Sequence, residues 1–69
     1  MPNADIIGAK IKELREGLNI SREVFCDDVG ISLSALSMYE TGQRIPRDEI
    51  KLKIARQLNT SIEALFFTS

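Results

Sequence analysis

The side chains of this sequence that could do chemistry are hydrogen-bonding and charged groups, not the paired groups of a catalytic centre. The chain has no histidine and a single cysteine. This excludes catalytic dyads built on histidine and the usual zinc-binding spacings of Cys and His. The sequence also lacks a glycine-rich loop that could cradle a phosphate group. We therefore expect a binding protein that is not an enzyme and that uses no metal and no cofactor.

One segment, residues 20–40, arranges its side chains in a form suited to binding. It contains two short helical patterns, each preceded by a serine whose hydroxyl can cap the helix. Gly30 suits the left-handed position that ends the first helix, and Cys26 is a small residue where the two helices must approach closely. Two short helices joined by a tight turn satisfy the geometry of a helix-turn-helix. The second helix, predicted over 32–41, turns outward four modest side chains that can lie against base edges: Leu33, Ser34, Ser37 and Met38.

The rest of the chain shows the spacing of further short helices. Asn3 or Asp5 can cap a first helix, whose apolar stripe is Ile7, Ile11, Leu14 and Leu18. Pro46 opens a fourth helix, whose apolar set is Ile50, Leu52, Ile54, Ala55 and Leu58. A last short helix is expected over 62–66, within a C-terminal segment of about 61–67. Because strand-like alternation is absent, the sequence predicts an all-α, compact five-helix fold as a single domain over residues 1–69.

Composition favours a folded, soluble chain. The hydrophobic content of 43% and the charged content of 28% are those of an ordinary globular domain. No apolar run approaches the ~20 residues of a membrane span. The single cysteine cannot form an internal disulfide, so Cys26 is expected to serve packing. We expect a cytoplasmic protein that does not enter a membrane.

Four segments of the chain also match a known family in order and spacing. They are IKELRE, ISREVFCDDVGIS, YETGQRIP and KIARQLNTSIEALF, and together they extend from about residue 7 to residue 66. In these segments the sequence resembles the Cro/lambda-repressor-like helix-turn-helix regulators, often called the Xre family. The resemblance implies a bacterial, sequence-specific DNA-binding transcriptional regulator that acts as a repressor. It further implies a lambda repressor-like homodimer that binds a short inverted repeat of double-stranded DNA, with the helix over 32–41 in the major groove.

The resemblance assigns roles to individual positions. Arg22 stands where relatives touch a phosphate and brace the recognition helix; the alternative is a surface residue paired with Glu23 or Asp27. Arg15 and Glu40 match a pair that forms a buried salt bridge between the first and third helices. The resemblance implies contacts with the DNA backbone for three residues after the recognition helix, Thr41, Gln43 and Arg44. It implies a further backbone contact for Arg47; the alternative is that Arg47 is a surface residue at the start of the fourth helix.

Two positions depart from the family pattern. Leu33 and Met38 are apolar where relatives often carry glutamine or arginine, so they cannot read guanine or adenine through two hydrogen bonds. Leu33 can still press on a thymine methyl group, and the two serines can pair with either base type. We expect specificity that rests on thymine contacts, water bridges and DNA shape.

Charge leaves a second function open. The net charge is −1, and residues 20–46 hold two bases, Arg22 and Arg44, against four acids. With Arg47 and one of Lys10 or Lys12 added as phosphate ligands, we predict a salt slope of roughly 3–4 per monomer. The alternative is a protein-interaction module, antirepressor-like or antitoxin-like, that uses the same fold.

The C-terminal segment carries more apolar surface than so short a helix is expected to bury. Leu65, Phe66 and Phe67 therefore form the predicted dimer interface. The alternative is that Phe66 closes the core of the monomer while Phe67 lies on its surface.

Overall fold

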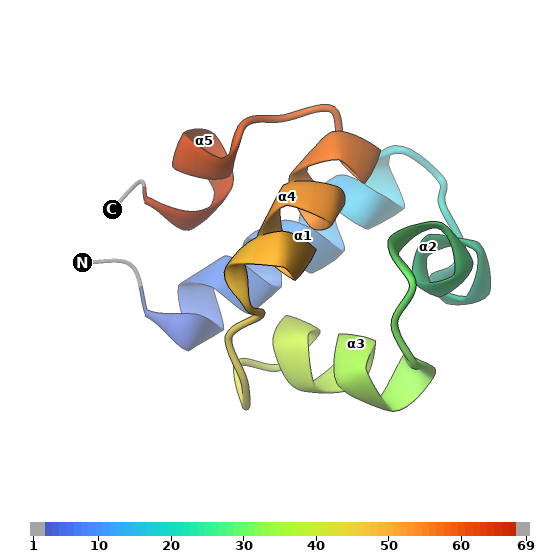
Figure 1. Cartoon of the computed structure of the whole chain (residues 1–69), viewed down its shortest axis with the longest axis horizontal. Helices are drawn as coiled ribbons and strands as arrows, with labels where there is room; N and C mark the ends of the chain where they lie inside the picture. The colour runs from blue at the N-terminus through green and yellow to red at the C-terminus, as the bar shows by residue number, and fades with distance from the viewer. Residues whose placement is uncertain (1–2, 68–69) are drawn as a thin grey trace.

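The computed structural model describes residues 3–67, which form five α-helices around one core (Figure 1). Their bounds are α1 Ala4–Gly17, α2 Arg22–Val29, α3 Leu33–Glu40, α4 Asp48–Gln57 and α5 Ile62–Phe66. None of the described residues belongs to a strand, and the expected five-helix, all-α fold is confirmed. The predicted domain also included residues 1, 2, 68 and 69, which lie outside the described part of the chain.

Side-chain caps start four of these helices. Of the two candidates before α1, Asn3 is the one used, because its Oδ1 accepts a hydrogen bond from the Ile6 backbone N–H at 2.9 Å. The hydroxyls of Ser21, Ser32 and Ser61 accept from the N–H three residues later, at 3.0–3.1 Å. The fourth helix, α4, begins without a side-chain cap, but two acidic residues in its first turn complement the helix dipole.

The turns between helices are short because the chain reverses through left-handed residues. Gly30 adopts a φ of 82°, as the sequence predicted, and Gly42 adopts 80°. The turns after α1 and α4 use asparagine instead, with φ values of 57° at Asn19 and 55° at Asn59. After each of the four, the next backbone N–H bonds to a carbonyl five residues back, at 2.8–3.1 Å. This pattern satisfies the last carbonyls of each helix within the turn itself.

The core collects apolar residues from every helix, including Ile11, Phe25, Leu36, Ile54 and Leu65. Two members of the predicted apolar sets are exposed instead. Leu18 is the C-cap residue of α1 and lies just beyond its last helical residue, so the helical repeat no longer directs its side chain toward the core. Leu52 lies two positions, about 200° of helical rotation, from the core-facing side of α4 marked by Ile50 and Ile54. Both predictions were wrong because they extended an apolar pattern beyond the buried face.

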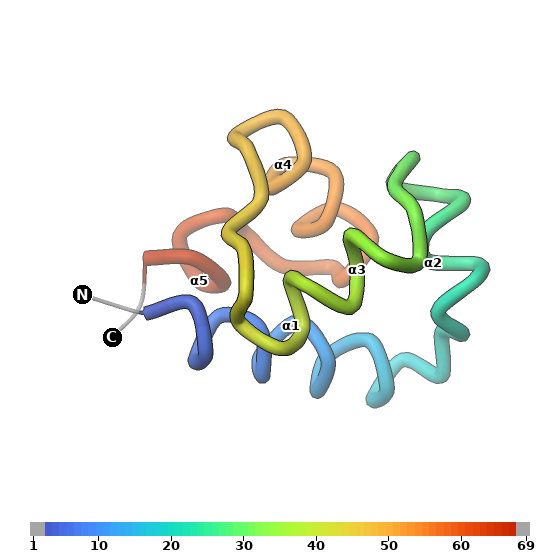
Figure 2. The backbone as a smooth tube through the Cα atoms, turned by 90° about the horizontal axis from the view of Figure 1, so that it is seen from below, coloured from blue at the N-terminus to red at the C-terminus, as the bar shows by residue number. Residues whose placement is uncertain are grey.

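The end of α3 packs against α1 at backbone distance. A Cβ atom added to Gly8 would lie 2.3 Å from the Tyr39 carbonyl oxygen and 2.7 Å from that of Glu40. Only glycine allows the two helices to come this close. Figure 2 shows this part of the fold from below: α3 and the loop after it cross the face nearest the viewer, and α1 runs along the lower part of the view.

The C-terminal helix is buried more completely than the sequence suggested. Leu65 and Phe66 lie in the core, and of the predicted interface trio only Phe67, 64% exposed, remains on the surface. The expectation that all three form a dimer interface is therefore corrected. Because α5 packs against both α1 and α4, it buries apolar side chains on two sides. The Lys10 ammonium donates to the Ala64 carbonyl at 3.0 Å and ties α5 to α1.

Candidate nucleic-acid interface

The helix-turn-helix consists of α2, the turn at Gly30 and α3. Burial of Phe25, Cys26 and Val29 holds α2 to the core, and burial of Leu36 and Tyr39 holds α3. None of the four predicted base-facing residues belongs to the buried set of α3. Two of them are exposed and two are half-buried: Leu33 and Ser34, then Ser37 and Met38.

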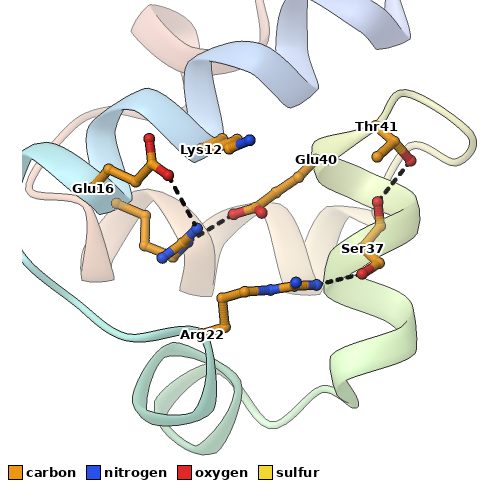
Figure 3. A pocket seen from close by; sticks show the side chains of 7 residues that line it. Lys12, Glu16, Arg22, Ser37, Glu40 and Thr41 are labelled. Atoms are coloured by element: carbon orange, nitrogen blue, oxygen red, sulfur yellow. Dashed lines mark hydrogen bonds and ion pairs between the residues drawn. The ribbon is translucent and has the colours of Figure 1, made fainter.

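A side-chain hydrogen bond joins the two helices of this unit on their outer side. Arg22, in the first turn of α2, extends its guanidinium group across to α3, where Nη2 donates to the Ser37 hydroxyl oxygen (Figure 3). The alternative partners Glu23 and Asp27 make no such bond with it among the hydrogen bonds and ion pairs of the described residues. The structure thus places Arg22 against the recognition helix.

Hydrogen bonding continues from Ser37 into the loop after α3. The Thr41 hydroxyl donates to the Ser37 carbonyl at 2.7 Å and accepts from the Gln43 amide nitrogen at 2.9 Å. A threonine hydroxyl has a single proton, and this one is used inside the protein. A phosphate offers only acceptors, so the Thr41 hydroxyl has no donor left for it in this arrangement. Thr41 therefore orients Gln43, whose amide keeps a second N–H for an external acceptor.

The two arginines beyond Gln43 are exposed but lie in different settings. Arg44 lies in the loop after α3, four residues beyond Glu40, and its backbone N–H bonds to the Met38 carbonyl at 3.2 Å, which anchors the loop. Arg47 stands at the start of α4 and lines a separate hollow of about 160 Å³ with Glu49 and Ile50. The structure brings Arg44 close to the end of the recognition helix and sets Arg47 apart.

Arg15 and Glu40 meet as a buried ion pair. The Arg15 Nε lies 2.8 Å from Glu40 Oε2, and the two side chains are only 7% and 6% exposed. Arg15 also donates through Nη1 to the Ile20 carbonyl at 2.9 Å, and its Nη2 lies 4.0 Å from the exposed carboxylate of Glu16. One guanidinium group in α1 thus holds the loop before α2 and the last turn of α3 together.

A polar groove of about 310 Å³ opens between α1, α2 and α3 (Figure 3). Its cationic wall includes Lys12, whose ammonium reaches the groove from α1, and Arg22. The sequence left Lys10 and Lys12 as equal candidates for a phosphate contact. The structure separates them, because Lys10 is engaged at α5. The complete lining is Lys12, Arg15, Glu16, Arg22, Ser37, Glu40 and Thr41.

The single cysteine serves packing between α2 and α3. The Cys26 side chain is buried, and its Sγ donates to the Ser32 carbonyl at 3.5 Å. Burial raises the pKa of the Cys26 thiol above its ordinary value of 9.0, and the positive charge of Arg22 opposes this rise. The thiol is therefore protonated and poorly nucleophilic at neutral pH. Among residues 3–67, no group of three or more His, Cys, Asp or Glu side chains could hold a metal ion.

Comparison with known proteins agrees with this geometry. The sequence profile of the helix-turn-helix family matches residues 11–65. The chain belongs to this family. It is 38% identical over 60 residues to the cryptic phage CTXphi transcriptional repressor RstR of Vibrio cholerae serotype O1 (strain ATCC 39315 / El Tor Inaba N16961). That match covers 81% of this chain and 54% of RstR, so this helix-turn-helix chain spans about half the length of its relative.

Two solved structures resemble the fold of this helix-turn-helix protein. One is the P22 c2 repressor in complex with the synthetic operator 9T, at a TM-score of 0.82 and 29% identity, covering 86% of this chain and 89% of the other. The second is the restriction-modification controller protein C.AhdI from Aeromonas hydrophila, at a TM-score of 0.80 and 30% identity, covering 87% and 91%. The resemblance to Cro/lambda-repressor-like regulators is confirmed. None of the helices formed by residues 3–67 is long and apolar enough to cross a membrane.

Proposed function

We propose that this protein is a sequence-specific DNA-binding transcriptional repressor that places α3 in the major groove. The observation that carries this proposal is the placement of α3 on an outer face, with Leu33 and Ser34 exposed at its start and donors from α2 and the following loop on either side. This is the docking geometry of helix-turn-helix proteins. The likeness to the P22 c2 repressor, solved with operator DNA, and to the repressor RstR supports it.

Contacts with bases come from the outward face of α3. Leu33, nearly half exposed, offers an apolar surface suited to a thymine methyl group, and Met38 can pack beside it. Ser34 and Ser37 offer hydroxyls that hydrogen-bond to base edges. Since no side chain here can make a two-bond contact with guanine or adenine, DNA shape and water bridges supply part of the specificity.

Contacts with the DNA backbone come from the cations and amides around α3. Arg22, Gln43 and Arg44 surround the recognition helix, and Lys12 adds a cation from α1. Arg47 is a more distant candidate at the start of α4. Each phosphate contact adds about 0.9 to the slope of log K against log salt, so these residues support a slope of roughly 3–4 per monomer.

The protein acts as a homodimer on an inverted repeat in this proposal, and it is a cytoplasmic protein of bacterial origin. Phe67 is the residue that supports dimerisation, because it is the one exposed aromatic of the described residues. Two copies of α3 can then enter successive major grooves about 34 Å apart. Pairing of two modest monomers also doubles the electrostatic contribution to binding.

Selection of bound sequences from a random duplex pool at ~50 mM salt tests the proposal. The expected result is an inverted repeat with centres one helical turn apart, and an affinity that falls steeply as salt is raised. Recovery of no duplex above background would overturn the proposal and favour the protein-interaction alternative. An apolar protein interface would respond little to salt.

A pair of variants separates affinity from specificity. Arg44→Ala removes an exposed cation and is expected to weaken binding to specific and random duplexes alike. Ser34→Ala removes an exposed hydroxyl and is expected to reduce mainly the difference between the two. Full discrimination by the Ser34 variant would remove that residue from the reading face.

A further inference from the structure

We propose that Leu33 detects the methyl group at C5 of a pyrimidine, so that this protein binds an operator more tightly when a cytosine at the contacted position is methylated at C5. This specificity rests on the proposed DNA-binding function and extends it from the sequence of the DNA to its covalent modification. For Leu33, 5-methylcytosine then takes the place of thymine.

Leu33 is the large apolar side chain that α3 exposes most. It is 47% exposed, whereas Leu36 and Tyr39 of the same helix are 0% and 7% exposed. Leu33 is also the first helical residue of α3, and the N-terminal residues of a recognition helix are those that contact base edges. An apolar group on a base edge would cover this surface and remove it from water.

The first turn of α3 is anchored at both of its polar ends, which fixes the backbone that carries Leu33. The Ser32 hydroxyl accepts from the Ala35 backbone N–H at 3.0 Å, and the Ser32 carbonyl accepts from the Leu36 N–H at 3.0 Å. The same carbonyl accepts from the buried Cys26 thiol at 3.5 Å, which joins this turn to α2. On an anchored backbone, a leucine in one of its staggered rotamers presents its methyl groups at a defined place.

The side chains at this end of α3 have no fixed preference for the polar groups of a pyrimidine. Leucine has no hydrogen-bonding group in its side chain. The neighbouring Ser34 is exposed, and its hydroxyl can donate to thymine O4 or accept from cytosine N4. Apolar contact therefore contributes more to discrimination at the start of α3 than hydrogen bonding does.

Thymine and 5-methylcytosine carry the same methyl group at the same ring atom, where it faces the major groove. They differ at C4, where thymine has an oxygen acceptor and cytosine an amino donor. Cytosine and uracil have only a hydrogen atom at C5. A side chain that contacts C5 through apolar atoms alone therefore groups thymine with 5-methylcytosine and separates both from cytosine and uracil.

Titration of four duplexes isolates the methyl group from the rest of the base. Selection with the wild-type protein and with Leu33→Ala first identifies the position at which a preference for thymine depends on Leu33. The duplexes then carry thymine, deoxyuridine, 5-methylcytosine or cytosine at that position in one half-site. Thymine and deoxyuridine both pair with adenine, and the two cytosines both pair with guanine, so each comparison changes the methyl group alone.

We expect wild type to bind the thymine duplex about 4-fold more tightly than the deoxyuridine duplex, which is the worth of burying one methyl group. The same factor is expected between 5-methylcytosine and cytosine. Leu33→Ala should reduce both ratios to below about 2-fold, because it removes most of the apolar surface that covers the methyl group. Leu33→Asn, which has a similar shape but ends in polar groups, should do the same.

Ser34→Ala is the matched control, because it removes a hydroxyl from the neighbouring exposed residue of α3 and keeps Leu33. It should weaken specific binding and leave both methyl ratios unchanged. A methyl group also alters the shape of the DNA, and a ratio that arises from shape would persist in Leu33→Ala. Since Leu33 is exposed, its variants are expected to keep the stability of wild type in urea denaturation.

The outcomes distinguish this specificity from the proposed function. Binding of wild type to no duplex would overturn both. Specific binding with no thymine preference that depends on Leu33, or with equal affinity for 5-methylcytosine and cytosine, would overturn the inference alone. Ratios that survive Leu33→Ala would likewise overturn it, because the methyl group would then act without Leu33. The two wild-type ratios need no variant, so they test the inference even if a substitution at Leu33 disturbs folding.

Discussion

Removal of the Glu40 carboxylate tests the energetic role of the ion pair between α1 and α3. Glu40→Ala leaves the Arg15 guanidinium buried, with the Ile20 carbonyl at 2.9 Å as its remaining buried partner. Stranding one member of a buried pair costs ~3–5 kcal/mol. Glu16 lies 4.0 Å from Arg15 Nη2 and can compensate part of the charge, so we expect a loss of about 3 kcal/mol in the free energy of unfolding. In a domain of this size that loss lowers Tm by about 12–24 °C.

Urea denaturation followed by far-UV circular dichroism measures this loss. Glu16→Ala is the matched control, because its exposed carboxylate contributes less than about 0.5 kcal/mol. The double variant Arg15→Ala with Glu40→Ala is expected to lose about 2 kcal/mol less than the sum of the two single variants. A loss below about 1 kcal/mol for Glu40→Ala, or strictly additive single variants, would refute the reasoning that the charge is buried and dependent on its partner.

Three further predictions address close packing, burial and assembly. Gly8→Ala is expected to lower the free energy of unfolding by about 1–3 kcal/mol, because the new methyl group overlaps the Tyr39 carbonyl. Gly17→Ala in the same helix meets open space and should instead raise it by up to about 1 kcal/mol, so equal effects in urea denaturation would contradict this account. Since the pKa of the Cys26 thiol is raised, the folded state keeps the thiol proton at a pH where the unfolded chain has lost it. The free energy of unfolding should therefore fall as pH rises above about 9, and it should fall less in Cys26→Ala. Phe67→Ser should lower the apparent mass in sedimentation while the domain stays folded, whereas an unchanged mass would move the interface elsewhere.

Local rules predicted the helices of this protein well. The three serine caps and the left-handed Gly30 lie where side-chain chemistry and backbone sterics put them. The last helix begins at Ile62 and ends at Phe66, as the spacing indicated. Such features depend on residues within one turn of each other, so the sequence alone contains the information.

Contacts between distant segments were harder to predict. Nothing in the sequence near Gly8 indicates that α3 will press its carbonyl oxygens against that position, because the constraint comes from residues some thirty positions later. Leu65 and Phe66 were assigned to an interface because a short helix was expected to have one buried side, but α5 lies against two helices. Burial of that kind is a property of the assembled fold.

In the candidate site, too, local features could be predicted from the sequence and contacts between helices could not. The helix that carries Leu33 and Ser34, and its outward face, follow from periodicity and from the resemblance. The resemblance implied that Arg22 braces the recognition helix, but its partner Ser37 could not be read from the sequence, because that contact depends on the angle between α2 and α3. That Thr41 has already used its proton was not predicted either, because a threonine hydroxyl can also point toward solvent. The sequence does place a donor-only side chain, Arg22, one helix before a hydroxyl group, but this placement does not identify which group accepts its hydrogen bond.

The position of Arg15 has a consequence for any attempt to graft the helix-turn-helix onto another protein. Its guanidinium group clamps the entry to α2 through the Ile20 carbonyl and the exit of α3 through Glu40, yet it belongs to neither helix. A peptide cut at the borders of the helix-turn-helix would leave this clamp behind and strand the Glu40 carboxylate. The recognition hairpin is therefore not a portable module. To transplant the outward face of α3 onto another scaffold, a designer must carry α1 along or rebuild the clamp.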